Sequence, residues 1–163
     1  MGLNRTQTQA GLFVLLLAAD QVSKWWIEQH GVLHFSTISV IPGLFNIVRA
    51  HNTGVAFSMF SDLSGAWRSY LLLGVTIGIA FIVSIWWWRE HRHAGVLPWA
   101  LTLILSGAAG NIWDRFQQGY VVDFLDFYIK IQGHEHHWPA FNVADSGITI
   151  GVAILLISSF RRA

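Results

Sequence analysis

Phe141 to Phe160, FNVADSGITIGVAILLISSF, is the stretch around which the rest of the chain is interpreted. It is long enough to cross the hydrocarbon core of a bilayer, which takes about 20 apolar residues. Its only charged residue is Asp145, in the first turns. A carboxyl group there is costly unless it faces a protein interior or a water-filled cavity, so Asp145 is a candidate functional residue. Its best candidate partner is Asp123, another acid embedded in apolar residues.

The composition is that of a membrane protein. Of the 163 residues, 53% are hydrophobic and 12% are charged, whereas a soluble domain carries about 25% charged residues. The nine Trp residues fit the same interpretation, because indole rings favour the headgroup region. The net charge of +1 gives no broad basic surface for nucleic acid. The absence of Cys excludes disulfides, thiolate metal ligands and a Cys nucleophile.

Four stretches of one domain, residues 1–163, are predicted to span the membrane: roughly 8–28, 69–88, 94–113 and 140–160. The first could be a cleaved signal peptide or a retained helix, and we expect the retained helix. The segments between the spans that carry most of the polar residues, 29–66 and 114–139, would share one face.

Basic residues indicate the orientation. Arg5, the Arg89/Arg92 loop and the Arg161-Arg162 end all fall on one side of a four-span chain. The positive-inside rule places that side, with both termini, in the cytoplasm. The segments 29–66 and 114–139 then open to the outer face.

Residues 32–48 are rich in Val, Ile, Phe and Thr and are interrupted by Ile41-Pro42-Gly43, which predicts a small strand pair. Residues 52–60 are a candidate lid. The predicted fold class is therefore an all-α membrane protein with four transmembrane helices, a small β element and a loop or short-helix lid on the outer face.

Asp123 and Asp145 are a candidate catalytic pair. Two carboxyl groups about 3 Å apart tend to share a proton, so one acts as general base on water and the other as general acid. The alternative is that Asp145 only favours a helix start and that Asp123 is an exposed loop acid. The helix macrodipole would favour ionised Asp145 and leave Asp123 as the proton holder.

The third predicted span ends in small residues followed by Asn111 and Arg115, which could point hydrogen-bond donors into a site. Alternatively, this end is an interfacial cap with a surface pair of Asp114 and Arg115. Asn142 lies three residues before Asp145 and could hold a substrate amide or cap the helix.

Asp20 and Lys24 are four residues apart on one predicted helix face, where they can pair. Lys24 could also extend to the lipid headgroups. Both a stabilising pair at a helix end and a role in the site fit this pattern.

The His-rich segment His134-Glu135-His136-His137 does not complete the zinc-peptidase motif H-E-x-x-H, because Trp138 occupies the last position. We therefore expect no metal and no other cofactor.

Taken together, the motifs resemble the prolipoprotein signal peptidases (signal peptidase II) of the bacterial inner membrane, over nearly the whole chain. The segments that carry the resemblance are Asp20-Gln21-Val22-Ser23-Lys24, Asn52-Thr53-Gly54-Val55-Ala56-Phe57-Ser58, Gly110-Asn111-Ile112-Trp113-Asp114-Arg115, Val121-Val122-Asp123-Phe124 and Pro139-Ala140-Phe141-Asn142-Val143-Ala144-Asp145-Ser146. The His-rich segment 132–138 departs from the family pattern and leaves the shape of that loop open.

The resemblance implies an aspartic endopeptidase with Asp123 and Asp145 as the catalytic pair. It implies that further residues line or support the site: Asp20, Lys24, Asn52, Gly54, Asn111, Arg115, Asn142 and Ala144. The implied substrates are prolipoproteins with diacylglycerol on a Cys, cut on the N-terminal side of that Cys. The other implied partners are membrane lipids and the cyclic peptide inhibitor globomycin.

Two other classes of protein fit parts of the pattern. A transport or ion-coupling protein would use Asp20 and Asp145 as a proton relay, although no internal repeat is visible. A four-span scaffold would have no chemistry. Cleavage of a lipidated precursor discriminates the peptidase from both.

Overall fold

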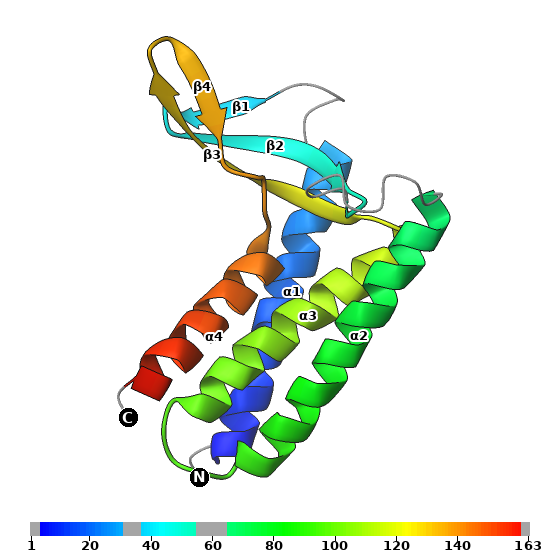
Figure 1. Cartoon of the computed structure of the whole chain (residues 1–163), viewed down its shortest axis with the longest axis vertical. Helices are drawn as coiled ribbons and strands as arrows, with labels where there is room; N and C mark the ends of the chain where they lie inside the picture. The colour runs from blue at the N-terminus through cyan, green and yellow to red at the C-terminus, as the bar shows by residue number, and fades with distance from the viewer. Residues whose placement is uncertain (1–3, 31–36, 55–64, 161–163) are drawn as a thin grey trace.

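The structure, a computed structural model, describes residues 4–30, 37–54 and 65–160. Four helices form a bundle and an antiparallel sheet covers one end of it (Figure 1). The helices are α1 (Arg5–His30), α2 (Gly65–Glu90), α3 (Leu97–Gln118) and α4 (Val143–Phe160). The start of α1, the end of α4 and the connection from α2 to α3 lie at the end of the bundle opposite the sheet.

The central helix of the bundle is α3, which packs against each of the other three. Glycines on α3 permit two of these approaches. A β-carbon at Gly107 would collide with the carbonyl of Ala144 on α4, and one at Gly110 would collide with the carboxyl group of Asp20 on α1. Small residues let membrane helices approach this closely, so α3 brings α1 and α4 together near the sheet.

Among the described residues, three segments are long and apolar enough to cross a membrane: Arg5–Gln29, Tyr70–Glu90 and Val143–Phe160. They match the predicted spans 8–28, 69–88 and 140–160. The third predicted span, 94–113, overlaps α3, which is not among these three segments. Because α3 continues to Gln118, Asp114 and Arg115 lie on the helix and not in the segment that follows it.

The strands are β1 (Ile38–Ile41), β2 (Phe45–Asn52), β3 (Val121–Ile131) and β4 (His134–His137), in the order β1-β2-β3-β4. The predicted strand pair around Pro42-Gly43 is confirmed as β1 and β2.

The predicted fold class is confirmed in part: the four helices and the β element are present, but the fold is not all-α, because β3 and β4 extend the strand pair to four strands. The start of β3, Val121 to Phe124, is buried on both faces and shows no alternation that would mark a strand. The His-rich segment predicted as a loop is a turn followed by β4, which pairs with β3.

Buried apolar residues join the sheet to the bundle. Ile27 of α1 packs with Val122 and Phe124 of β3. The chain before α4 is bound to the same strand, because Leu125 and Phe141 each donate a backbone hydrogen bond to the other's carbonyl, at 2.8 and 3.1 Å. Asp123, between Val122 and Phe124, is thereby held beside the start of α4. The predicted lid, residues 52–60, lies mostly outside the described residues.

Candidate active site

One residue, Asn142, contacts both predicted catalytic acids. Its side-chain amide donates a hydrogen bond to Oδ1 of Asp123 at 2.8 Å, and its backbone N–H donates to Oδ2 of Asp145 at 3.3 Å. Its Oδ1 accepts a hydrogen bond from the backbone N–H of Asp145 at 2.9 Å. These reciprocal bonds form a capping box at the start of α4. The predicted capping role of Asn142 is confirmed. Its fully buried amide is directed at protein groups, and its role toward a substrate amide stays a prediction.

Asp123 is only 2% exposed and accepts a second hydrogen bond from the amide of Asn52, at 2.9 Å to Oδ2. Asn52 is oriented in turn by the backbone N–H of Gly54, which donates to its Oδ1 at 2.8 Å from a turn with φ +85°. Burial raises the pKa of Asp123 to about 6, opposed by the bond from Asn52 and increased by the charge of Asp145. A carboxyl group with such a pKa exchanges protons near neutral pH.

Asp145 differs from Asp123 because it is only partly buried and lies in the first turn of a helix. There the helix macrodipole favours a carboxylate. The amide of Asn111, on α3, donates a hydrogen bond to Oδ1 of Asp145 at 2.7 Å. Arg115, one turn further along α3, interacts through its positive charge with both acids. The two acids therefore have unequal surroundings and share one cation.

Lys24 connects α1 to α3 beneath the acids. Its ammonium group lies 2.8 Å from Oδ2 of Asp20 and 2.8 Å from Oδ2 of Asp114, and it donates to Oδ1 of Asn111 at 3.0 Å. The predicted pair of Asp20 and Lys24 is confirmed. The predicted extension of Lys24 to the headgroups is wrong, because its side chain is buried where two carboxylates compensate its desolvation. Lys24 thereby holds Asn111 in place, and the amide of Asn111 donates a hydrogen bond to Asp145.

Asp20 links this ion network to α4. Its Oδ1 accepts a hydrogen bond from the backbone N–H of Ala144 at 2.9 Å. The first N–H groups of a helix have no partner within the helix, and a carboxylate there also interacts favourably with the macrodipole. Ala144 therefore contributes to the arrangement through its backbone.

Two residues of this network, Asp114 and Gln21, were not among the predicted site residues. Asp114 is buried and pairs with Lys24 instead of forming a surface pair with Arg115. The amide of Gln21 donates to Oδ1 of Asp114 at 3.0 Å and to Oδ2 of Asp20 at 3.1 Å. The sequence spacing could have indicated Asp114 as a site residue, because it lies three residues after Asn111 on the same helix face.

The His-rich segment lies apart from these acids, on β4. Nδ1 of His137 lies 2.8 Å from Oδ1 of Asp126, and this hydrogen bond raises the pKa of His137. Asp126 also accepts a hydrogen bond from the amide of Asn46 at 3.0 Å. Within the described ranges, no group of three His, Asp or Glu side chains is arranged to hold a metal ion. The hydrogen bond between His137 and Asp126 therefore joins the edge strand β4 to β3.

Comparison with known proteins places this arrangement in a family. The family described as Signal peptidase (SPase) II matches residues 12–161. The lipoprotein signal peptidase of Acinetobacter baylyi is 43% identical over 150 residues, which cover 92% of this chain and 80% of that protein. The corresponding protein of Solibacter usitatus is 40% identical over 151 residues, covering 93% and 89%.

Two solved structures, both described as bacterial membrane enzymes, share the fold. One has a TM-score of 0.81 at 31% identity and covers 96% of this chain and 94% of its own. The other has a TM-score of 0.78 at 30% identity and covers 94% and 88%. The chain therefore belongs to the signal peptidase II family of aspartic peptidases.

Proposed function

We propose that this protein removes the signal peptide from prolipoproteins that carry diacylglycerol on a Cys, and that it cuts on the N-terminal side of that Cys. Membership of the signal peptidase II family supports the reaction class. The assignment of Asp123 and Asp145 as the catalytic pair rests on one observation, the contact of Asn142 with both acids.

In the proposed active form of the enzyme, Asp123 carries the proton and Asp145 is the group that accepts a proton from water. Two observations support this division. Burial raises the pKa of Asp123 to about 6, and Asp145 lies at the start of a helix, where a negative charge is favoured. Asp145 is then the general base and Asp123 the general acid.

The proposed reaction has two steps. In the first, Asp145 takes a proton from water, the oxygen of that water bonds to the scissile carbonyl carbon, and Asp123 gives its proton to the carbonyl oxygen. In the second, the carbon–nitrogen bond breaks, the leaving nitrogen takes the proton from Asp145, and Asp123 recovers a proton from a hydroxyl group of the intermediate. Both acids return to their initial state.

The residues around the pair act as positioning residues. Asn52 and Asn111 each orient one acid through an amide hydrogen bond, and Arg115 supplies a positive charge where negative charge develops. Lys24 and Asp20 hold Asn111 and the start of α4 in place. Gly54 allows the turn that directs Asn52.

We further propose that α3 also crosses the membrane, which gives four spans in the bacterial inner membrane with both termini in the cytoplasm. Because α3 is surrounded by the other three helices, it needs less apolar surface than a helix that faces lipid. Arg5, Arg89 and Arg92 lie at the end of the bundle opposite the sheet, as the positive-inside rule requires. The acids then lie near the outer face, where a lipidated substrate and water both have access. We expect globomycin to compete with substrate there.

The test is cleavage of a lipidated precursor by Asp123→Asn and Asp145→Asn, each purified from membranes. Both variants are expected to lose about 10²–10⁴-fold in turnover, because each removes an acid–base group. Asp126→Asn is the matched control, since Asp126 lies on the same strand and also accepts an Asn amide; it should stay within a few-fold of the parent. Substantial cleavage by Asp123→Asn or Asp145→Asn would show that the two acids are not the catalytic pair.

A further inference from the structure

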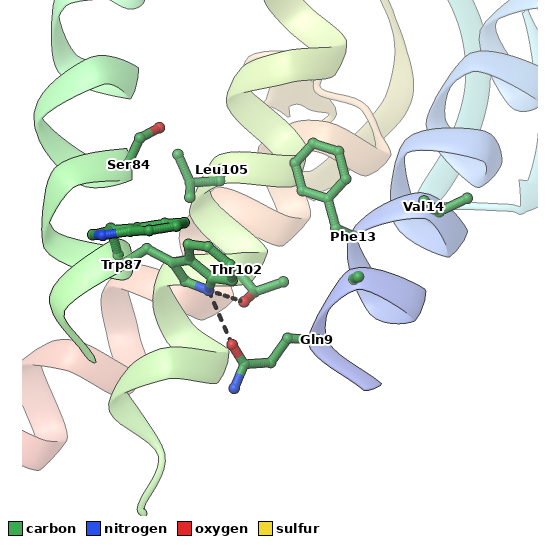
Figure 2. A pocket seen from close by; sticks show the side chains of 9 residues that line it. Gln9, Phe13, Val14, Ser84, Trp87, Thr102 and Leu105 are labelled. Atoms are coloured by element: carbon green, nitrogen blue, oxygen red, sulfur yellow. Dashed lines mark hydrogen bonds between the residues drawn. The ribbon is translucent and has the colours of Figure 1, made fainter. Parts of the chain in front are cut away.

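A groove between α1 and α2 has no part in the proposed peptidase site. Both helices pack on α3, but within the described residues they scarcely touch each other. A partly open cavity of about 390 Å³ lies between them, with α3 behind it (Figure 2). Its lining residues come from the start of α1 and the end of α2, so it lies at the end of the bundle opposite the sheet (Figure 1).

The groove is suited to hydrocarbon. Its walls are largely apolar and include Phe13 of α1, Leu105 of α3 and the ring of Trp87 of α2. Polar atoms at its inner end bond to one another, because Nε1 of Trp87 donates to Oε1 of Gln9 and to Oγ1 of Thr102, both at 3.0 Å. A ligand that enters therefore meets an apolar surface whose polar groups already have partners.

Basic side chains from both walls lie at the end of the groove. Arg5 lies one turn before Gln9 on α1 and donates to the carbonyl of His93 at 3.4 Å. From the other wall, Nε of Arg92 donates to Nε2 of His91 at 3.3 Å, and the ring of His91 stacks on Trp87 with centroids 4.8 Å apart.

Arg89, at the end of α2, is exposed at the same end of the bundle, whereas Glu90 there is paired with His93 at 3.1 Å. The end of the groove therefore carries a positive charge. Basic pockets between transmembrane helices attract anionic lipid headgroups, and each basic residue near the surface adds to the attraction.

We propose that this groove binds one anionic phospholipid, with an acyl chain between α1 and α2 and the phosphate between Arg5 and Arg92. Under the proposed topology this lipid belongs to the cytoplasmic leaflet, on the side opposite the catalytic acids. The site does not depend on the peptidase reaction.

The test is photo-cross-linking in phosphatidylcholine nanodiscs that contain a trace of phosphatidylglycerol or phosphatidylcholine with a diazirine on one acyl chain. Cross-links from phosphatidylglycerol are expected at the groove residues of α1, α2 and α3, several-fold above those from phosphatidylcholine. The double variant R5Q/R92Q should lower this labelling at least about fivefold, since each Arg contributes to headgroup binding. R49Q/K130Q, which changes two basic residues of the sheet, should leave it unchanged.

A second pair of variants tests the cavity without changing charge. Ala10→Trp places an indole ring in the groove and should abolish the labelling, whereas Ile82→Trp, at an exposed position of α2, should not. Asp123→Asn should lose cleavage but keep full labelling, which separates this proposal from the proposed function.

Equal labelling by the two lipids would overturn the proposal, as would cross-links spread evenly over all four helices. Displacement of the lipid by a prolipoprotein precursor would also overturn it, because the groove would then belong to the signal peptide.

Discussion

Two asparagines of β2 each donate a hydrogen bond to an aspartate of β3, but the two aspartates have different neighbours. Asn52 donates to Asp123 at 2.9 Å and Asn46 donates to Asp126 at 3.0 Å. Asp123 is influenced by the charge of a second acid, whereas Asp126 is bonded to His137. The bond from Asn52 is therefore the one expected to tune a proton that takes part in the reaction.

Asn52→Leu should shift the pH dependence of cleavage upward. The bond from Asn52 favours ionised Asp123, so its removal raises the pKa of Asp123 above about 6. In the proposed mechanism Asp123 must be protonated, so kcat/KM falls as pH rises through this pKa. The fall should move to higher pH by about one to two units in the variant, since a hydrogen bond to a charged group is worth about 1.5–3 kcal/mol.

Asn46→Leu is the control, because it removes the equivalent bond to Asp126. Its profile of kcat/KM against pH should coincide with that of the parent. An unchanged profile for Asn52→Leu, or a fall at lower pH, would show that Asp123 is not the titrating acid.

The individual residues of the site were the easiest part of the structure to predict from the sequence. Asp123, Asp145 and Asn111 stood out because ionisable and amide groups are costly among apolar residues, and the structure joins all three through Asn142. The burial of Lys24 could not be predicted, because it depends on Asp114 of another helix, which lies far away in the sequence.

At the level of elements, the close approach of α3 to α4 depends on a glycine. A β-carbon at Gly107 would collide with the carbonyl of Ala144 and lie 2.7 Å from Cγ1 of Ile148. Gly107→Ala should therefore lower the free energy of unfolding by about 1–3 kcal/mol, the usual cost of overpacking. It should also lower cleavage, because separating these helices weakens the bond from Asn111 to Asp145. Thermal unfolding in detergent and turnover measure the two effects.

Gly74→Ala on α2 is the matched control. An added β-carbon at Gly74 meets no atom within 4 Å, and Ala has the higher helix propensity, by about 1 kcal/mol. This variant should be as stable as the parent or more so. Equal destabilisation by both variants would show that the effect at Gly107 is not one of contact with α4.

The strands were harder to predict than the helices. The pair around Pro42-Gly43 has its own turn signal, whereas β3 has no local signal at its start. Val121 to Phe124 are buried between the sheet and the bundle, so both faces of the strand are covered and the alternation disappears. The pairing of β2 with β3 joins segments far apart in the chain, which no local pattern contains.

For the whole molecule, the proposed topology predicts opposite accessibility of the two ends of the bundle. The chain has no Cys, so a Cys introduced by substitution is the only thiol in this protein that a maleimide can label. Lys130→Cys, on the sheet, should react with a membrane-impermeant maleimide in cells whose outer membrane has been opened. Ala94→Cys, in the connection between α2 and α3, should react only after the inner membrane is disrupted.

The same two variants provide the controls, since each must be labelled fully after solubilisation. Labelling of Ala94→Cys before disruption, or protection of Lys130→Cys, would reverse the orientation and place the acids on the cytoplasmic side.

The short connections of the two acids to the helices have a consequence for the membrane itself. Only Gly119 and Tyr120 separate α3 from the strand that carries Asp123, and Asp145 belongs to the first turn of α4. Helices that meet a thicker or thinner bilayer respond by tilting or by deforming it, and here both acids would travel with them as one rigid unit. If the proposed function is correct, we therefore expect the enzyme to select the bond to be cut by its distance from the lipid anchor and not by the thickness of the surrounding bilayer.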